Sequence, residues 1–126
     1  PALKSIEEAG VPLTVIDFNS RAVEELRETG IGGVVGDARR IDILRAAGVG
    51  AARLVIVSLP DPAAAAEVVR QARSLAASVP IVARCGYNRA EALLWDAGAT
   101  EVILEEEAVG LVLDRAAGAQ LDLAPV

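Results

Sequence analysis

The chain has 126 residues, enough for one domain, and its core must be largely aliphatic because it holds one Trp, one Tyr and one Phe. Its formal net charge of −6 argues against a nucleic-acid or anionic-membrane surface, since each of those needs a basic stripe to neutralise phosphates. Histidine is absent and Cys85 is the only cysteine, which excludes an internal disulfide, a cysteine-clustered zinc site and the commonest general base.

The first half of the sequence alternates apolar runs with helical stretches, and Gly, Asn or Asp marks each switch. The near-continuous apolar run at residues 12–17 is typical of a strand covered on both faces. Asn19 or Ser20 can cap the helix that follows, and Gly30 can close it. In chain order we expect a helix at residues 3–9 ending at Gly10, a strand at 12–17, a helix to about 29, a strand at 33–36 and a helix at 39–47.

The second half continues this alternation. Residues 53–59 (RLVIVSL) are the most strand-like stretch, and beyond them Asp61 is a good N-cap and Pro62 a good first helical residue. Further expected elements are a helix at 63–77, a strand at 80–84, a helix from Asn88 to Gly98, a strand at 101–104 and a helix at 106–117. Five strands that alternate with helices predict an α/β, Rossmann-like fold: a doubly wound parallel sheet with right-handed crossovers and helices on both faces.

Ligands of open parallel sheets bind beyond the carboxyl ends of the strands, so polar residues there are candidates. Asp17 ends the first expected strand, where an acidic residue can accept hydrogen bonds from the ribose hydroxyls of adenosine. It can equally start the turn before the helix. Asp37 can accept a hydrogen bond from the adenine amino group, or it can cap the helix at residues 39–47. Position alone leaves both interpretations open for each aspartate.

Two further candidates follow later strands. Ser58 places a hydroxyl at the end of the strongest strand, and it is also simply the last residue before a loop. Arg84 closes an otherwise apolar strand, so it can contact a phosphate or carboxylate, or form a surface ion pair. The three glutamates at residues 105–107 favour the positive end of a helix dipole over a metal site, because they cannot all face one point. Cys85 has no His or Lys partner to activate it, and we expect neither a metal nor a catalytic residue.

Several stretches together resemble the RCK N-terminal domain family, also called TrkA-N or KTN. They are residues 15–49 (VIDFNSRAVEELRETGIGGVVGDARRIDILRAAGV), 54–73 (LVIVSLPDPAAAAEVVRQAR), 80–84 (PIVAR) and 98–113 (GATEVILEEEAVGLVL). Their combination is specific although no single one is, and the LPDP and GATEVILEE segments look most like Kef-type potassium/proton antiporters. Members of this family are regulatory modules that bind NAD(H) or AMP in potassium channels, Trk-type uptake systems and Kef-type antiporters.

The resemblance implies a role for each candidate residue. Asp17 matches the acidic residue that holds the adenosine ribose, with Asn19 just after it. Gly36, Asp37 and Ala38 match the Gly-Asp-Ala motif that reads adenine, Asp37 through its side chain and Ala38 through its main-chain amide. The remaining matches lie at strand ends beside the bound nucleotide: Ser58, Leu59 and Arg84.

The chain departs from the family pattern at its start. The family begins with a strand and a glycine-rich G-x-G-x-x-G turn that holds the pyrophosphate, and this chain has neither. We therefore expect residues 1–126 to be one such domain lacking its first strand, with a gap of roughly 10 Å between the strands at 12–17 and 53–59. Three accounts stay open: the segment belongs to a longer parent protein, a shortened chain closes its sheet differently or borrows a strand from a second copy, or residues 120–126 fill the gap.

The resemblance implies a cytoplasmic regulatory domain of an inner-membrane potassium transport protein, gated by NAD(H) or AMP and not an enzyme. Its expected partners are an adenine nucleotide, the membrane transporter portion of the parent protein and a second copy in a homodimer. No nucleic acid or direct membrane insertion is expected, since no apolar run approaches ~20 residues and no signal peptide is present. Two alternatives stay open: a fragment of an NAD-dependent dehydrogenase, which would share the fold, and a dimerisation module without ligand.

Overall fold

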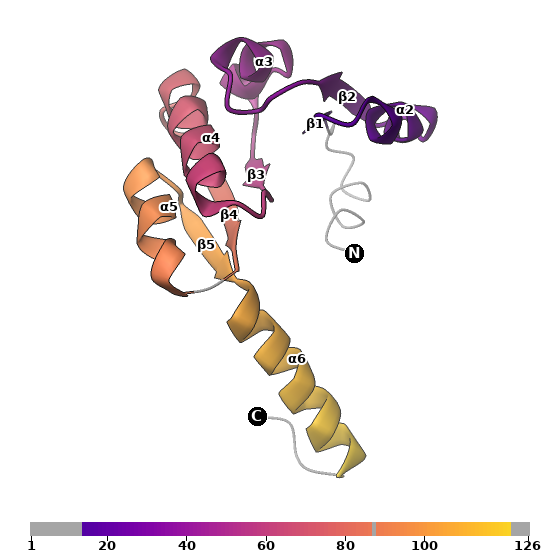
Figure 1. Cartoon of the computed structure of the whole chain (residues 1–126), viewed down its shortest axis with the longest axis vertical. Helices are drawn as coiled ribbons and strands as arrows, with labels where there is room; N and C mark the ends of the chain where they lie inside the picture. The colour runs from indigo at the N-terminus through magenta and orange to yellow at the C-terminus, as the bar shows by residue number, and fades with distance from the viewer. Residues whose placement is uncertain (1–13, 87, 122–126) are drawn as a thin grey trace. The chain divides into compact units, whose positions relative to one another are not determined.

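The computed structural model describes residues 14–86 and 88–121 (Figure 1). The helix expected at residues 3–9 lies outside this range, as do Tyr87 and nearly all of the C-terminal tail at residues 120–126. The chain divides into two compact units. The first unit comprises residues 1–52 and 71–77, and the second unit comprises residues 53–70 and 78–126.

The first unit is built on a β–α–β crossover. Strands β1 (Thr14–Asp17) and β2 (Gly32–Val35) pair in parallel, and helix α2 (Ser20–Glu28) connects them. Asn19 is the cap of this helix, because its Oδ1 accepts hydrogen bonds from two first-turn amides at 3.0 and 3.2 Å. Gly30 follows the helix at φ +88°, a left-handed conformation that favours glycine and turns the chain back toward β2.

Close packing of α2 on β2 forms part of the core of the first unit. Val23 of α2 is completely buried, and a Cβ placed on Gly33 of β2 would lie 2.5 Å from Val23 Cγ1. Helix α3 (Ile41–Ala46), which buries Leu44, starts two residues later than expected because residues 37–40 form a turn. A 3-10 turn at Val49–Ala51 follows it.

The second unit contains a three-stranded parallel sheet in the order β3-β4-β5. Its strands are β3 (Val55–Val57), β4 (Ile81–Cys85) and β5 (Glu101–Leu104). Strand β3 is shorter than the apolar run at residues 53–59, because only these three residues pair with β4. The central strand β4 buries alternate side chains, which is the period-two pattern of a strand packed on one face.

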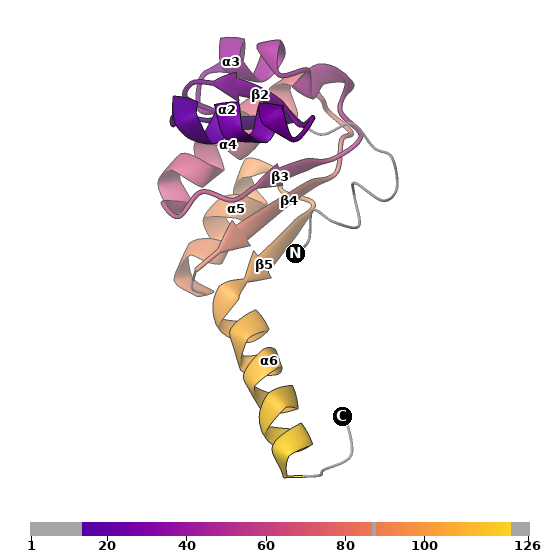
Figure 2. The ribbon, with the colours of Figure 1, turned by 90° about the vertical axis from the view of Figure 1, so that its right-hand side faces the viewer.

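Helices α4 (Pro62–Leu75) and α5 (Glu91–Ala97) lie on the same face of this sheet (Figures 1 and 2). Asp61 Oδ1 accepts a hydrogen bond from the Ala63 amide at 3.0 Å, so the expected cap followed by Pro62 is confirmed. A 3-10 turn at Asn88–Ala90 precedes α5, and Gly98 ends that helix at φ +114°, as expected. Helix α6 (Glu105–Gln120) follows β5 directly. The residues of α4 that are buried are Ala65, Ala66, Val68, Val69 and Ala72.

All five strands of the described residues pair in parallel, which confirms the predicted α/β class. They form two separate ladders, β1-β2 and β3-β4-β5, and within the described residues no backbone pairing joins β1 to β3. None of the helices in the described residues is long and apolar enough to cross a membrane.

Candidate functional site

The carboxyl edge of the β1-β2 ladder brings together three of the predicted site residues. Asp17 lies opposite Val35 in the register, and the Gly36 amide donates a hydrogen bond to the Asp17 carbonyl at 2.9 Å. The ladder therefore continues one residue past the strands and fixes the backbone of Asp37 beside that of Asp17. Backbone geometry alone presents two carboxylates at one edge of the first unit.

Asp17 starts the turn before α2, and its carboxyl group still has acceptor positions for a ligand. Its Oδ1 accepts a hydrogen bond from the Asn19 amide at 2.8 Å, which forms the turn before α2. An ionised carboxylate has two oxygens and about four acceptor positions, so this bond leaves room for ribose hydroxyls. Asn19 is different, because its Oδ1 is already engaged by two amides of the α2 first turn.

Asp37 is held by Arg39, a residue that the sequence analysis did not single out. Asp37 Oδ1 accepts from the Arg39 amide at 2.9 Å and from Nε at 3.0 Å, while Oδ2 accepts from Nη2 at 2.7 Å. The hydrogen bond from the Arg39 side chain, followed by the one from its amide, holds the pKa of Asp37 below the ordinary value. The contact with Arg39 therefore favours the ionised carboxylate, and a ligand must displace or share Arg39.

The helix-capping alternative for Asp37 is wrong. Helix α3 begins at Ile41, with Arg40 at the N-cap position and no side-chain cap. Instead, the Asp37 carbonyl accepts a hydrogen bond from the Arg40 amide at 3.0 Å, closing a turn that contains the half-buried Ala38. The carboxylate of Asp37 acts within that turn and not on the helix.

Gly36 has a packing role as well as its place in the motif. A Cβ at this position would lie 2.7 Å from Ile43 Cδ1, so the missing side chain lets α3 approach the end of β2. The terminal methyl group of Ile43, from α3, occupies this space. Close packing therefore explains the glycine without any ligand, and its role in nucleotide binding stays a prediction.

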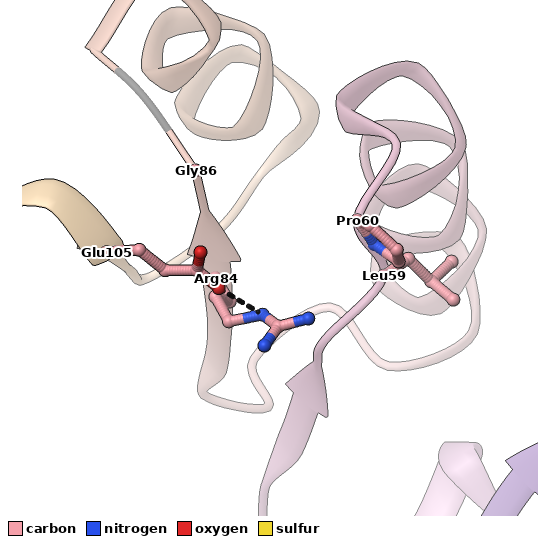
Figure 3. A pocket seen from close by; sticks show the side chains of 5 residues that line it. All are labelled: Leu59, Pro60, Arg84, Gly86 and Glu105. Carbon is pink, nitrogen blue, oxygen red and sulfur yellow. Dashed lines mark ion pairs between the residues drawn. The ribbon is translucent and has the colours of Figure 1, made fainter.

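The remaining predicted residues meet in the second unit, at the ends of β3 and β4. Arg84 Nη2 donates to the Ser58 carbonyl at 3.0 Å, so the main chain of Ser58, not its hydroxyl, makes this contact. Arg84 Nε lies 2.9 Å from Glu105 Oε1, which is the surface ion pair allowed by the sequence. Figure 3 shows the guanidinium reaching from β4 toward the chain that follows β3. A pocket of about 430 Å³ is lined here by Leu59, Pro60, Arg84, Gly86 and Glu105.

Each unit thus offers different chemistry. The Asp17–Asp37 edge of the first unit supplies carboxyl oxygens as acceptors for hydroxyl and amino groups, whereas Arg84 in the second unit supplies a guanidinium for an oxyanion. Within the described part of the chain no group of three His, Cys, Asp or Glu side chains could hold a metal ion.

The model of the TrkA-N domain family matches residues 2–105. Because the match covers most of the 126 residues, the chain belongs to the TrkA-N domain family, and the resemblance of its motifs is confirmed.

Relatives with curated names are membrane transport proteins. The chain is 32% identical over 99 residues to YbaL of Escherichia coli strain K12, covering 79% of this chain and 18% of that protein. It is 34% identical over 76 residues to the glutathione-regulated potassium-efflux system protein KefC of Cronobacter sakazakii, covering 60% of this chain and 12% of that protein. The chain thus spans less than a fifth of the length of these relatives.

Solved structures of the same fold include ligand complexes. The TrkA-N domain of the inner membrane protein ybaL from Escherichia coli matches with a TM-score of 0.84 and 28% identity, covering 90% of this chain and 84% of that chain. The GsuK channel bound to NAD matches with a TM-score of 0.78 and 27% identity, over 88% of this chain and 20% of that chain. The AMP-bound Kef C-terminal domain of Shewanella denitrificans shares the fold, with a TM-score of 0.66 and 24% identity over 86% of this chain and 80% of that chain.

Proposed function

We propose that this chain is a regulatory adenine-nucleotide-binding domain of a potassium transport protein, and that it performs no catalysis. NAD(H) or AMP binds at the carboxyl ends of the strands and shifts the balance between two arrangements of the domain. The shift passes to the membrane transporter portion of the parent protein. Its size is limited by the difference between the ligand's affinities for the two arrangements.

The observation that carries this proposal is that Asp17 and Asp37 lie at the same edge of the β1-β2 ladder. The register of β1 with β2 and the Gly36–Asp17 backbone bond hold the two carboxylates at adjacent strand ends. Carboxylates in such positions suit the ribose hydroxyls and the adenine amino group. Binding of NAD by the GsuK channel, a structural relative at 27% identity, supports the same ligand class for this chain.

The parent protein is proposed to be a Kef-type cation:proton antiporter or a related Trk system or channel, with this domain in the cytoplasm. Support comes from the names of the relatives, among which KefC is a potassium-efflux system protein. We further propose a homodimer, because α6 exposes Leu111, Val112 and Leu113 by 59%, 65% and 64% in the single chain. Such consecutive apolar side chains gain stability when a second copy covers them. Sedimentation of the chain with Leu111→Ser measures this, and an unchanged sedimentation coefficient would contradict it.

The test of nucleotide binding is a calorimetric titration of the folded chain with AMP and with NADH. Asp37→Asn is expected to weaken binding by roughly ten- to a hundredfold, because a hydrogen bond to a charged group contributes about 1.5–3 kcal/mol. Asp42→Asn is the matched control. Asp42 lies in the same unit and also pairs with a nearby arginine, Arg40 at 3.1 Å, but it is 61% exposed and away from the strand ends.

Three results would contradict the proposal. A folded chain that binds neither AMP nor NADH is not a sensor of these nucleotides and leaves the dimerisation module as the surviving alternative. Equal losses in Asp37→Asn and Asp42→Asn would show a charge effect and not a binding contact. Hydride transfer between NADH and any of a panel of small carbonyl compounds would favour the dehydrogenase alternative.

A further inference from the structure

Arg84 connects three elements of the second unit. It lies near the end of β4, opposite Ile103 of β5. Its Nη2 bonds to the Ser58 carbonyl just past β3, and its Nε pairs with Glu105, the first residue of α6. The two bonds use two of the five N–H donors of a guanidinium, so the group keeps further donors for an additional acceptor.

The pocket beside Arg84 has the features of an oxyanion site in which the carboxylate of Glu105 takes the place of the oxyanion. Its volume of about 430 Å³ lies within the range of small-molecule sites. A cation and a carboxylate line it together, and a Cβ placed on Gly86 would contact nothing within 4 Å. Arg84 and Glu105 are 44% and 45% exposed, so solvent and a dissolved anion can reach both partners.

Glu105 is also the connection between this pocket and α6. The N-cap residue Leu104 makes no side-chain cap, so capping does not hold the first turn of the helix. Within the described part of the chain, Arg84–Glu105 is the one ion pair that joins α6 to another element. Loss of this pair frees the first turn, while farther along the helix Leu111 and Val112 are already exposed.

We propose that the pocket lined by Leu59, Pro60, Arg84, Gly86 and Glu105 binds a phosphate group, and that this group displaces Glu105 from Arg84 and loosens the start of α6. Two oxygens of the phosphate can accept hydrogen bonds from the planar guanidinium at the same time, and arginine favours such bidentate contacts. Glu105 and the phosphate compete for the same guanidinium, so a change that weakens the Arg84–Glu105 pair strengthens phosphate binding by up to the factor by which the pair is weakened. The pocket is built from residues of the second unit alone, and where the phosphate is that of a nucleotide this inference rests on the proposed function.

The first test is an NMR titration of the full chain with inorganic pyrophosphate, against sodium chloride at equal ionic strength because salt alone screens an exposed pair. Shifts are expected for the amides of Gly86 and Glu105, and Arg84→Gln should lose them. Glu105→Gln should bind pyrophosphate about two- to fivefold more tightly, the factor by which an exposed ion pair competes. Glu107→Gln, which removes the same charge from the same helical turn, should bind as the parent chain does.

The second test is hydrogen exchange of the second-turn amides of α6, because these amides donate to the carbonyls of the first turn. Saturation with pyrophosphate should speed their exchange about two- to fivefold, and Glu105→Gln should exchange at that faster rate without any ligand. Pyrophosphate should then cause no further change in Glu105→Gln. A purely structural ion pair would give the faster exchange in the variant but no tighter binding.

The outcomes separate this proposal from nucleotide sensing. Equal pyrophosphate affinity in Glu105→Gln and Glu107→Gln would overturn the proposal that phosphate displaces Glu105 from Arg84. Amide hydrogen exchange in α6 that is unaltered at saturation would overturn it as well. If AMP reproduces the response and adenosine does not, the phosphate is that of a nucleotide; if pyrophosphate alone acts, the site takes a free oxyanion. Binding of AMP that depends on Asp37 but leaves α6 unchanged refutes this inference and retains the proposed function.

Discussion

Replacement of Gly33 by alanine tests the contact that sets the spacing of α2 and β2. The added Cβ would lie 2.5 Å from Val23 Cγ1, whereas ordinary van der Waals contacts begin near 3.4 Å. Val23 is completely buried, and its β-branched side chain has one strongly preferred rotamer in a helix. The helix must therefore move by about 1 Å, because the side chain cannot turn away.

The magnitude follows from two opposing effects. Overpacking a filled core costs about 1–3 kcal/mol, whereas replacing glycine by alanine within a strand gains about 0.5–1 kcal/mol from chain entropy. We expect Gly33→Ala to destabilise the fold by about 1–2 kcal/mol. In a Val23→Ala background the nearest remaining atoms are 3.6 Å away, so the same replacement should be neutral or stabilising. The resulting coupling energy between the two positions is about 1–3 kcal/mol.

The assay is urea unfolding followed by far-ultraviolet circular dichroism for the parent, both single variants and the double variant. Gly36→Ala is the matched control, because its Cβ would meet Ile43 Cδ1 at 2.7 Å, the mobile end of a flexible side chain. Its cost should stay within about 1 kcal/mol. If Gly33→Ala destabilises the Val23→Ala background as much as the parent chain, the steric argument is refuted.

Three further predictions concern other parts of the fold. Asp61→Ala removes the N-cap of α4 and should cost about 0.5–2 kcal/mol in urea unfolding, with no effect on nucleotide titration. Leu94→Ala should cost about 2–5 kcal/mol because Leu94 is completely buried, whereas Leu93→Ala, at a 47% exposed position, should change stability little. Because Arg39 lowers the pKa of Asp37, their bonds stabilise the fold above the ordinary value of 3.8, and this contribution is lost as the pH falls through the lowered pKa. Arg39→Gln should return the Asp37 pKa toward 3.8 in an NMR titration; an unchanged pKa would contradict the assigned cause.

The helix caps and helix ends that depend on neighbouring residues could be predicted from the sequence. Asn19 and Asp61 cap their helices through bonds to amides two or three residues away, and Gly98 ends α5 through its own backbone conformation. Such signals depend on neighbouring residues, so residue type and spacing suffice to predict them. The alternation of strands and helices and the family itself followed from the same kind of pattern.

Two element ends differ from those that the sequence predicts. The apolar run at residues 53–59 suggested a long strand, but β3 extends only over the three residues that pair with β4. The start of α3 was placed too early, because the turn closed by Asp37 holds residues 38–40 out of the helix. The end of β3 is decided by its pairing with a distant strand, whereas the start of α3 is decided by a local turn that competes with the helix.

The same division applies to the candidate site. The sequence by itself identified Asp17 and Asp37 as polar residues at strand ends, because the carboxyl ends of parallel strands share one edge. Only the tertiary structure showed that Arg39 engages Asp37 and that Arg84 joins Ser58 to Glu105, residues 26 and 21 positions away along the chain. The physical reason is that several acids could pair with each arginine, and backbone positions decide which one does. For Arg39 those positions are set by the turn at residues 37–40, and for Arg84 they are set by the folding of the whole chain.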